Sequence, residues 1–226
     1  MDSFIYYDEE KKLMIHIYED NEGRLCPYAF LEGPIFKQYA AYISMKKDLI
    51  DCIQAISYLK IINDDNTIPQ IVKSSLLFST IVKYAKCFTS GEGRGTSLNK
   101  STVFRNEYSS LLDFHDTTME LRNKYLAHAG NSEHESRAIL AILNPDKENK
   151  KREKIVYSGI RLKDDDVHID DYMELFQGVM EHVDKKIETL LPIVNQKADE
   201  IELEELYKKS KIPDPDKFIP FDVNFI

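Results

Sequence analysis

Hydrophobic residues recur every three or four positions along two long segments in the first half of the chain. In residues 34–62 they are Ile43, Leu49, Ile50, Ile53, Ile56 and Leu59, and in residues 68–88 they are Ile71, Phe78, Ile81, Val82, Ala85 and Phe88. This spacing is typical of helices that bury one face, and Pro34 suits the first turn of the first helix. We therefore predict two helices separated by a turn at residues 63–66.

Two further segments show helical spacing. Residues 107–128 carry two apolar stripes, which predicts burial on two sides, by the rest of a bundle and by a partner chain. The stripes are Tyr108, Leu112, Met119 and Leu126, and Leu111, Phe114, Leu121 and Tyr125. Residues 170–210 form a long apolar repeat that contains Pro192, which is expected to kink the helix or to split it in two.

Two short runs of β-favouring residues, 4–7 and 13–18, predict one β-hairpin, and alternating residues at 136–144 with a returning strand at 154–162 predict another. The fold class that follows is mainly α: a bundle of four to five helices with one or two small β-hairpin appendages. We divide the chain into an N-terminal hairpin part (1–33), the bundle with its inserted hairpin at about 136–162 (34–210), and an extended C-terminal tail (211–226).

Net charge and cysteine content indicate which partners and which cellular compartment to expect. A net charge of −9 speaks against general nucleic-acid binding, yet residues 83–128 contain seven Lys or Arg against five Asp or Glu. Such a strip could guide a phosphate to one place, although a solvated surface of mixed charge explains it nearly as well. The three separated cysteines favour a reducing cytosol over a disulfide framework or a zinc site. Without a signal-peptide pattern or an apolar run of about 20 residues, we expect a cytoplasmic protein that does not use a membrane.

Candidate chemistry is concentrated at the end of the 107–128 segment, where Arg122, Asn123 and His128 lie within two turns. A histidine exchanges protons near neutral pH, and an arginine stabilises charge on phosphate oxygens, so this set could cleave a phosphodiester without a metal. On a straight α-helix Arg122 and His128 point about 120° apart. Either the last turn unwinds or a second copy of the helix completes the site in a symmetric dimer.

A structural interpretation of the same residues stands beside the catalytic one. Gly130 suits the position after a helix C-terminus, where His128 would favour the negative end of the helix. Arg122 could pair with Glu120 or Asp116, and His115, one heptad earlier, is typical of a core histidine.

The stretch from Leu121 to His128, with Arg122, Asn123 and His128 in the pattern Arg-Asn-x4-His, resembles the signature of the HEPN superfamily, most closely its prokaryotic abortive-infection branch. The glycine-rich segment at 84–95 also looks like the helix end and loop before the motif helix in that branch. The resemblance spans about residues 68–128. It implies a helical bundle, a homodimer and a metal-independent endoribonuclease of a toxin or phage-defence system, with an antitoxin or defence protein as a further partner.

Carried over by this resemblance, Arg122, Asn123 and His128 are the catalytic residues, and no metal or cofactor is expected. We add Lys124, Arg94, Tyr125 and His115 as candidate contacts to the RNA substrate, Arg94 from a flexible glycine-rich loop. Residue 130 is Gly, so the HEPN variant in which a Tyr at this position is nucleotidylated is not expected. The alternative function is a non-catalytic HEPN-like dimeric scaffold, or a module that binds a partner or a nucleotide.

Overall fold

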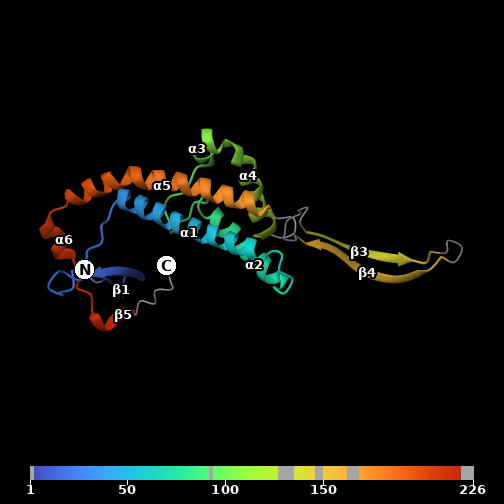
Figure 1. Cartoon of the computed structure of the whole chain (residues 1–226), viewed down its shortest axis with the longest axis horizontal. Helices are drawn as coiled ribbons and strands as arrows, with labels where there is room; N and C mark the ends of the chain where they lie inside the picture. The colour runs from blue at the N-terminus through green and yellow to red at the C-terminus, as the bar shows by residue number, and fades with distance from the viewer. Residues whose placement is uncertain (1–2, 92–93, 127–134, 146–149, 162–167, 220–226) are drawn as a thin grey trace. The chain divides into compact units, whose positions relative to one another are not determined.

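The computed structural model describes residues 3–91, 94–126, 135–145, 150–161 and 168–219 of the chain. The chain forms two compact units. The helical unit comprises Lys37–Leu190, and the terminal unit combines Met1–Phe36 with Leu191–Ile226. Figure 1 shows the secondary structure, in which helices predominate and two antiparallel hairpins are present; this confirms the predicted mainly α class with hairpin appendages.

The helical unit is built from segments that the hydrophobic pattern largely located. They are α1 (Pro34–Ile62), α2 (Gln70–Ala85), α3 (Lys100–Val103), the 3₁₀-helix η1 (Asn106–Leu111), α4 (Leu112–Glu120), the π-helix η2 (Leu121–Leu126) and α5 (Ile169–Asp199). Ion pairs show how the long helices run. Lys46 pairs with Asp184 and Lys60 with Asp170, so α1 and α5 are antiparallel. α1 and α2 are also antiparallel, since Lys83 pairs with Asp51 and Lys86 with Asp48.

One hydrophobic core joins the helices of this unit. Its fully buried side chains include Met45, Leu49, Cys52, Ile56, Leu59, Leu77, Ile81, Tyr84, Leu175, Phe176, Val179 and Val183. The buried face of α1 therefore follows positions 45, 49, 52, 56 and 59. Ile43 and Ile50, which the sequence pattern placed on this stripe, are exposed, as are Ile71 and Val82 of α2. The helical period places these four residues beside the core rather than in it.

Helix continuity differs from the expectation in two regions. The 107–128 segment is not one α-helix: its described part changes from 3₁₀ to α to π geometry. α3 was not expected at all. Of the two effects expected of Pro192, a kink or a split, the split does not occur: α5 continues through Pro192 to Asp199, and the break comes before α6 (Leu203–Lys209). A proline costs one backbone hydrogen bond, and this helix tolerates the loss.

The second hairpin consists of β3 (Glu135–Leu143) and β4 (Arg152–Arg161), and it confirms the prediction for this region. The strands are antiparallel, with Ile139 opposite Tyr157 and Ala141 opposite Ile155. A register shift between Ile142 and Leu143 marks an irregularity in the ladder. The hairpin forms a two-stranded sheet of its own.

The terminal unit contains a three-stranded antiparallel sheet in the order β2-β1-β5. Its strands are β1 (Ser3–Asp8), β2 (Leu13–Tyr18) and β5 (Phe218–Ile219), and η4 (Pro215–Lys217) precedes β5. The C-terminal tail thus returns to the N-terminal hairpin, where Phe218 stacks on Phe4. Within the described ranges, none of the helices is long and apolar enough to cross a membrane.

Candidate functional site

The candidate site begins on η2, the single π-helical turn that continues α4. Within it the Arg122 guanidinium donates a hydrogen bond from Nη1 to Oδ1 of Asn123, at 2.8 Å. Arg122 is half-buried and Asn123 is exposed. Since an arginine has only donors, this contact also fixes which amide atom of Asn123 faces it. The two neighbouring motif residues therefore act as one unit at the surface of the helical unit.

The start of the π-helical turn is held by the core. Leu111, His115, Thr118 and Leu121 are buried on one face of η1, α4 and the beginning of η2. The turn also contacts α2. Single π turns within α-helices are rare and are often found at functional sites. Here the change of geometry falls on the residues that the motif singles out, so the side-chain directions assumed for a straight α-helix do not apply to them.

The positive charge of Arg122 is not neutralised within the described part of the chain. No ion pair joins its guanidinium to a carboxylate there; the hydrogen bond runs to a neutral amide. Asp116, one of the partners considered from the sequence, pairs instead with Lys100, whose Nζ lies 2.7 Å and 2.9 Å from the two carboxylate oxygens. An arginine with a neutral partner retains charge for an anionic ligand.

Three other predicted site residues are placed only in part or not at all. The backbones of Lys124 and Tyr125 belong to η2, but their side chains lie outside what the structure describes, as does the whole of His128. Their roles, and the convergence of His128 on Arg122, stay predictions.

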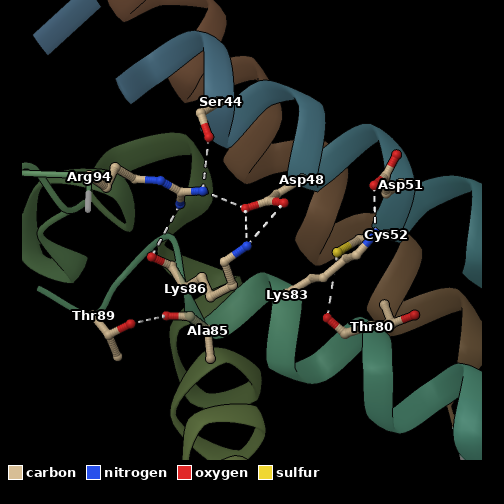
Figure 2. Close-up of polar contacts among 10 residues, drawn as sticks. All are labelled: Ser44, Asp48, Asp51, Cys52, Thr80, Lys83, Ala85, Lys86, Thr89 and Arg94. Carbon is tan, nitrogen blue, oxygen red and sulfur yellow. Dashed lines mark hydrogen bonds and ion pairs between the residues drawn. The ribbon is translucent and has the colours of Figure 1, made fainter. Parts of the chain in front are cut away.

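Arg94 lies in a different environment from the one that the sequence suggested (Figure 2). Its Nη2 is 2.5 Å from Oδ2 of Asp48 on α1 and 3.1 Å from Oγ of Ser44, and its Nη1 donates to the carbonyl of Lys86. The Arg94 side chain is 14% exposed and that of Asp48 is 15% exposed. We call Ser44, Asp48, Lys86 and Arg94 the Arg94 cluster.

The Arg94 cluster fastens the described part of the glycine-rich loop to α1. Burial raises the pKa of Asp48, but hydrogen bonds from Arg94 and Lys86 outweigh it, so this pKa lies below its ordinary value and the carboxylate stays charged. Further along the loop, the Leu98 amide donates to the Cys87 carbonyl. Gly95, at φ +68°, adopts a left-handed conformation that suits glycine. Arg94 is committed to an internal ion pair, so the geometry gives no support to a substrate contact from a flexible tip.

His115 is a core residue, 2% exposed. Its Nδ1 lies 2.7 Å from the Tyr84 hydroxyl, and its ring packs against Phe88 and Phe104 with centroids 4.4 Å and 4.6 Å away. Burial lowers the pKa of His115 to about 4 and raises that of Tyr84. The ring is therefore neutral near pH 7, and its Nδ1 shares one hydrogen bond with the Tyr84 hydroxyl, whose direction depends on the tautomer of the ring. This buried environment gives no support to RNA binding by His115.

Sequence reasoning missed the partners of these two residues. Asp48 lies 46 positions from Arg94, and Tyr84 lies 31 positions from His115. The available signal was helical register: Tyr84 follows Leu77 and Ile81 on the buried face of α2, where a hydroxyl requires a polar partner. In the described part of the chain, no three His, Cys, Asp or Glu side chains are grouped so as to hold a metal ion.

Comparison of the chain with models of protein families, with curated proteins and with solved structures found no match.

Proposed function

We propose that the protein is a metal-independent endoribonuclease whose site contains Arg122, Asn123 and His128. The observation that carries the proposal is the Arg122–Asn123 pair: a guanidinium held by a neutral amide, on a π-helical turn, at the start of an Arg-Asn-x4-His motif. The resemblance of this motif to HEPN ribonucleases supplies the reaction class and the setting, a prokaryotic toxin or phage-defence system.

In the proposed reaction the 2′-hydroxyl of RNA attacks the adjacent phosphorus and displaces the 5′-oxygen of the next nucleotide. His128 removes the hydroxyl proton or protonates the leaving oxygen, and the His128 of a second subunit is available for the complementary transfer. Arg122 stabilises the negative charge on the non-bridging oxygens. Asn123 positions the Arg122 guanidinium, and Lys124 is a peripheral phosphate contact.

The test is cleavage of a single-stranded RNA by the purified protein with EDTA present. The expected products end in 2′,3′-cyclic phosphate and 5′-hydroxyl, and DNA of the same sequence is not cut because it lacks the nucleophile. His128→Ala removes a positioned acid or base and is expected to reduce the rate by about 10²–10⁴. His168→Ala is the matched control, since His168 is an exposed histidine outside the motif. Cleavage that needs Mg²⁺, or that survives His128→Ala, refutes the mechanism, whereas the absence of any cleavage favours the scaffold function.

A mixing experiment tests whether the site is shared between two subunits. If Arg122 of one chain acts with His128 of the other, mixed dimers of the inactive Arg122→Ala and His128→Ala proteins contain one intact site. Activity should then return on mixing, to a fraction of the wild-type value. No recovery, with dimers shown to exchange subunits, means either that each chain forms its site alone or that a shared site needs both His128 side chains.

A further inference from the structure

The start of β4 carries a group of cations without carboxylate partners. Lys150, Arg152 and Lys154 are exposed, and none of the three forms an ion pair within the described residues, whereas Lys151 pairs with Glu153 at 3.4 Å. No other stretch of five residues in the described ranges contains three such cations. Residues 146–154 carry five Lys or Arg against three Asp or Glu, so cations stay in excess however the other carboxylates pair. Cations without a carboxylate partner keep their charge for an anionic ligand.

The register of the hairpin puts Arg152 on the same face as Tyr157. Opposite residues of antiparallel strands point to the same face, and so do alternate residues of one strand. The ladder pairs Ile139 with Tyr157 and Leu143 with Arg152, and a shift in register leaves Glu153 out of it. Irregularities of this kind re-aim side chains and are often found beside functional sites. One face of the hairpin thus presents a tyrosine and an arginine four ladder positions apart, about 14 Å.

The surface between these two side chains is apolar and open. Ile139 is 71% exposed, Leu143 66% and Tyr157 62%, and Ile155 is exposed as well. We call the surface formed by these four residues and Arg152 the Tyr157 face. Single-stranded nucleic acids bind to surfaces of this composition, because bases stack on aromatic rings while cations contact the phosphates.

We propose that the Tyr157 face binds the single-stranded RNA substrate. A base stacks on Tyr157, Arg152 contacts a phosphate of the same strand, and Lys150 and Lys154 add contacts to neighbouring phosphates. The identity of the ligand rests on the proposed ribonuclease function. β3 begins seven residues after His128, a stretch that spans at most about 25 Å, so RNA held on the hairpin stays within reach of the motif.

The composition of the hairpin favours a nucleic acid over two other ligands. Lysine is depleted in protein–protein interfaces, whereas nucleic-acid interfaces are strongly positive. A lipid interior does not accept the unpaired backbone groups along the edges of a two-stranded sheet. A strand in which planar bases alternate with phosphates offers a partner both to the ring of Tyr157 and to the guanidinium of Arg152.

Fluorescence anisotropy of the full-length protein with a single-stranded 2′-O-methyl RNA, which the proposed reaction cannot cleave, tests the site. Combining Lys150→Ala, Arg152→Ala and Lys154→Ala should weaken binding at least about tenfold at low salt. It should also reduce the steepness with which log Kd depends on log salt concentration by about 2, because each phosphate contact to a single strand contributes about 0.7. Far-UV circular dichroism checks that the variant is folded.

Matched variants separate this site from a general effect of charge. Alanine at Lys37, Lys47 and Lys208, exposed lysines for which the structure describes no ion pair, removes the same charge and should keep the wild-type salt dependence. Tyr157→Ala should weaken binding about fivefold to a hundredfold without changing the salt dependence, because it removes stacking and no charge. Tyr207→Ala, at a tyrosine of similar exposure, should have no effect.

The proposal is overturned if the triple hairpin variant keeps the wild-type salt dependence or if Tyr157→Ala binds RNA as tightly as wild type. It is also overturned if the triple variant loses binding to vesicles of anionic lipid while its binding to RNA is unchanged, which would assign the cations to a lipid surface.

Failure of this inference can be told apart from failure of the proposed function. If the protein cleaves RNA and the hairpin variants change neither Kd nor KM, the hairpin site is refuted and the ribonuclease stands. If wild type binds the RNA through the hairpin but cleaves none, the hairpin site stands and the ribonuclease is refuted.

Discussion

Arg94 and Arg122 lie in the same helical unit and were both predicted to contact phosphate, yet their surroundings differ. Arg94 is largely buried and pairs with the Asp48 carboxylate, while Arg122 is half-buried and is bound to the neutral amide of Asn123. The Arg94 guanidinium is neutralised by Asp48, and this ion pair holds the described part of the loop to α1. Among the residues that the structure describes, no carboxylate pairs with the Arg122 guanidinium, which is held by the neutral amide. An arginine's partner, rather than its position beside a motif, indicates whether it is available to an anionic ligand.

The largest expected effect is on catalysis at Arg122. Arg122→Ala should lower the rate of RNA cleavage by about 10²–10³, because removal of one positioned donor to a transition-state oxygen has this effect in other enzymes. The free energy of unfolding should change by less than about 1 kcal/mol, because no described ion pair is broken. Arg105→Ala, at an exposed arginine in the same unit, serves as the control. Initial rates and urea denaturation measure the two quantities. Equal rates for Arg122→Ala and wild type would show that Arg122 does not take part in catalysis.

The second prediction concerns Arg94, the arginine whose partner is a carboxylate. Asp48→Ala leaves Arg94 without its carboxylate in a largely buried position and should lower the free energy of unfolding by about 2–4 kcal/mol. Asp113→Ala, at an exposed aspartate of α4, should change it by no more than about 0.5 kcal/mol.

A double-mutant cycle with Arg94→Ala isolates the pair. Because the two residues are in direct contact, the double variant should lose less stability than the two single variants together. Additive losses, measured by urea denaturation, would show that the ion pair contributes little and that Arg94 acts only by packing.

A third prediction uses pH and concerns the core beneath the motif. The ordinary pKa of His115 is 6.5, and burial lowers it to about 4 in the folded protein. Between these values the unfolded chain binds the proton and the folded chain does not. Stability is therefore greatest above pH 6.5 and falls as the pH drops toward 4, by at most about 1.4 kcal/mol per pH unit from this residue.

His115→Gln keeps a hydrogen-bonding partner for the Tyr84 hydroxyl but does not titrate, so its free energy of unfolding should depend less steeply on pH between 6.5 and 4. Carboxylates contribute equally to both proteins and cancel in the difference. His168→Gln, at an exposed histidine, should keep the wild-type slope. If the slopes of His115→Gln and wild type coincide, His115 binds a proton without opening the core.

The sequence predicted those features that depend on local pattern. The bounds of α1 follow from Pro34 and a regular apolar repeat, the first hairpin follows from two β-favouring runs, and the second follows from alternation. The π-helical turn could not be predicted in this way, since Leu121–Leu126 has the spacing of an ordinary α-helix. The strand pairing of Phe218 depends on a contact with a segment more than 200 residues away. The motif singled out Arg122 and Asn123, which the structure joins by a hydrogen bond. The ion pair of Arg94 depends on Asp48, a distant carboxylate that no local pattern reveals.

The smallest expected effect comes from giving Arg122 the kind of partner that Arg94 has. Asn123→Asp preserves the size and the acceptor atom of the side chain but replaces a neutral amide with a carboxylate. The guanidinium should remain in place with its charge largely neutralised, so we expect a three- to tenfold lower rate of RNA cleavage, roughly 1 kcal/mol in the barrier. Asn123→Ala removes the acceptor and leaves the charge, and so tests positioning alone. Raised salt should narrow the gap between Asn123→Asp and wild type, because screening weakens the interaction of Arg122 with both the carboxylate and the phosphate at this exposed position. If Asn123→Asp matches wild type while Asn123→Ala loses activity, Asn123 acts only by holding Arg122, and the neutrality of its amide is not what distinguishes the two arginines.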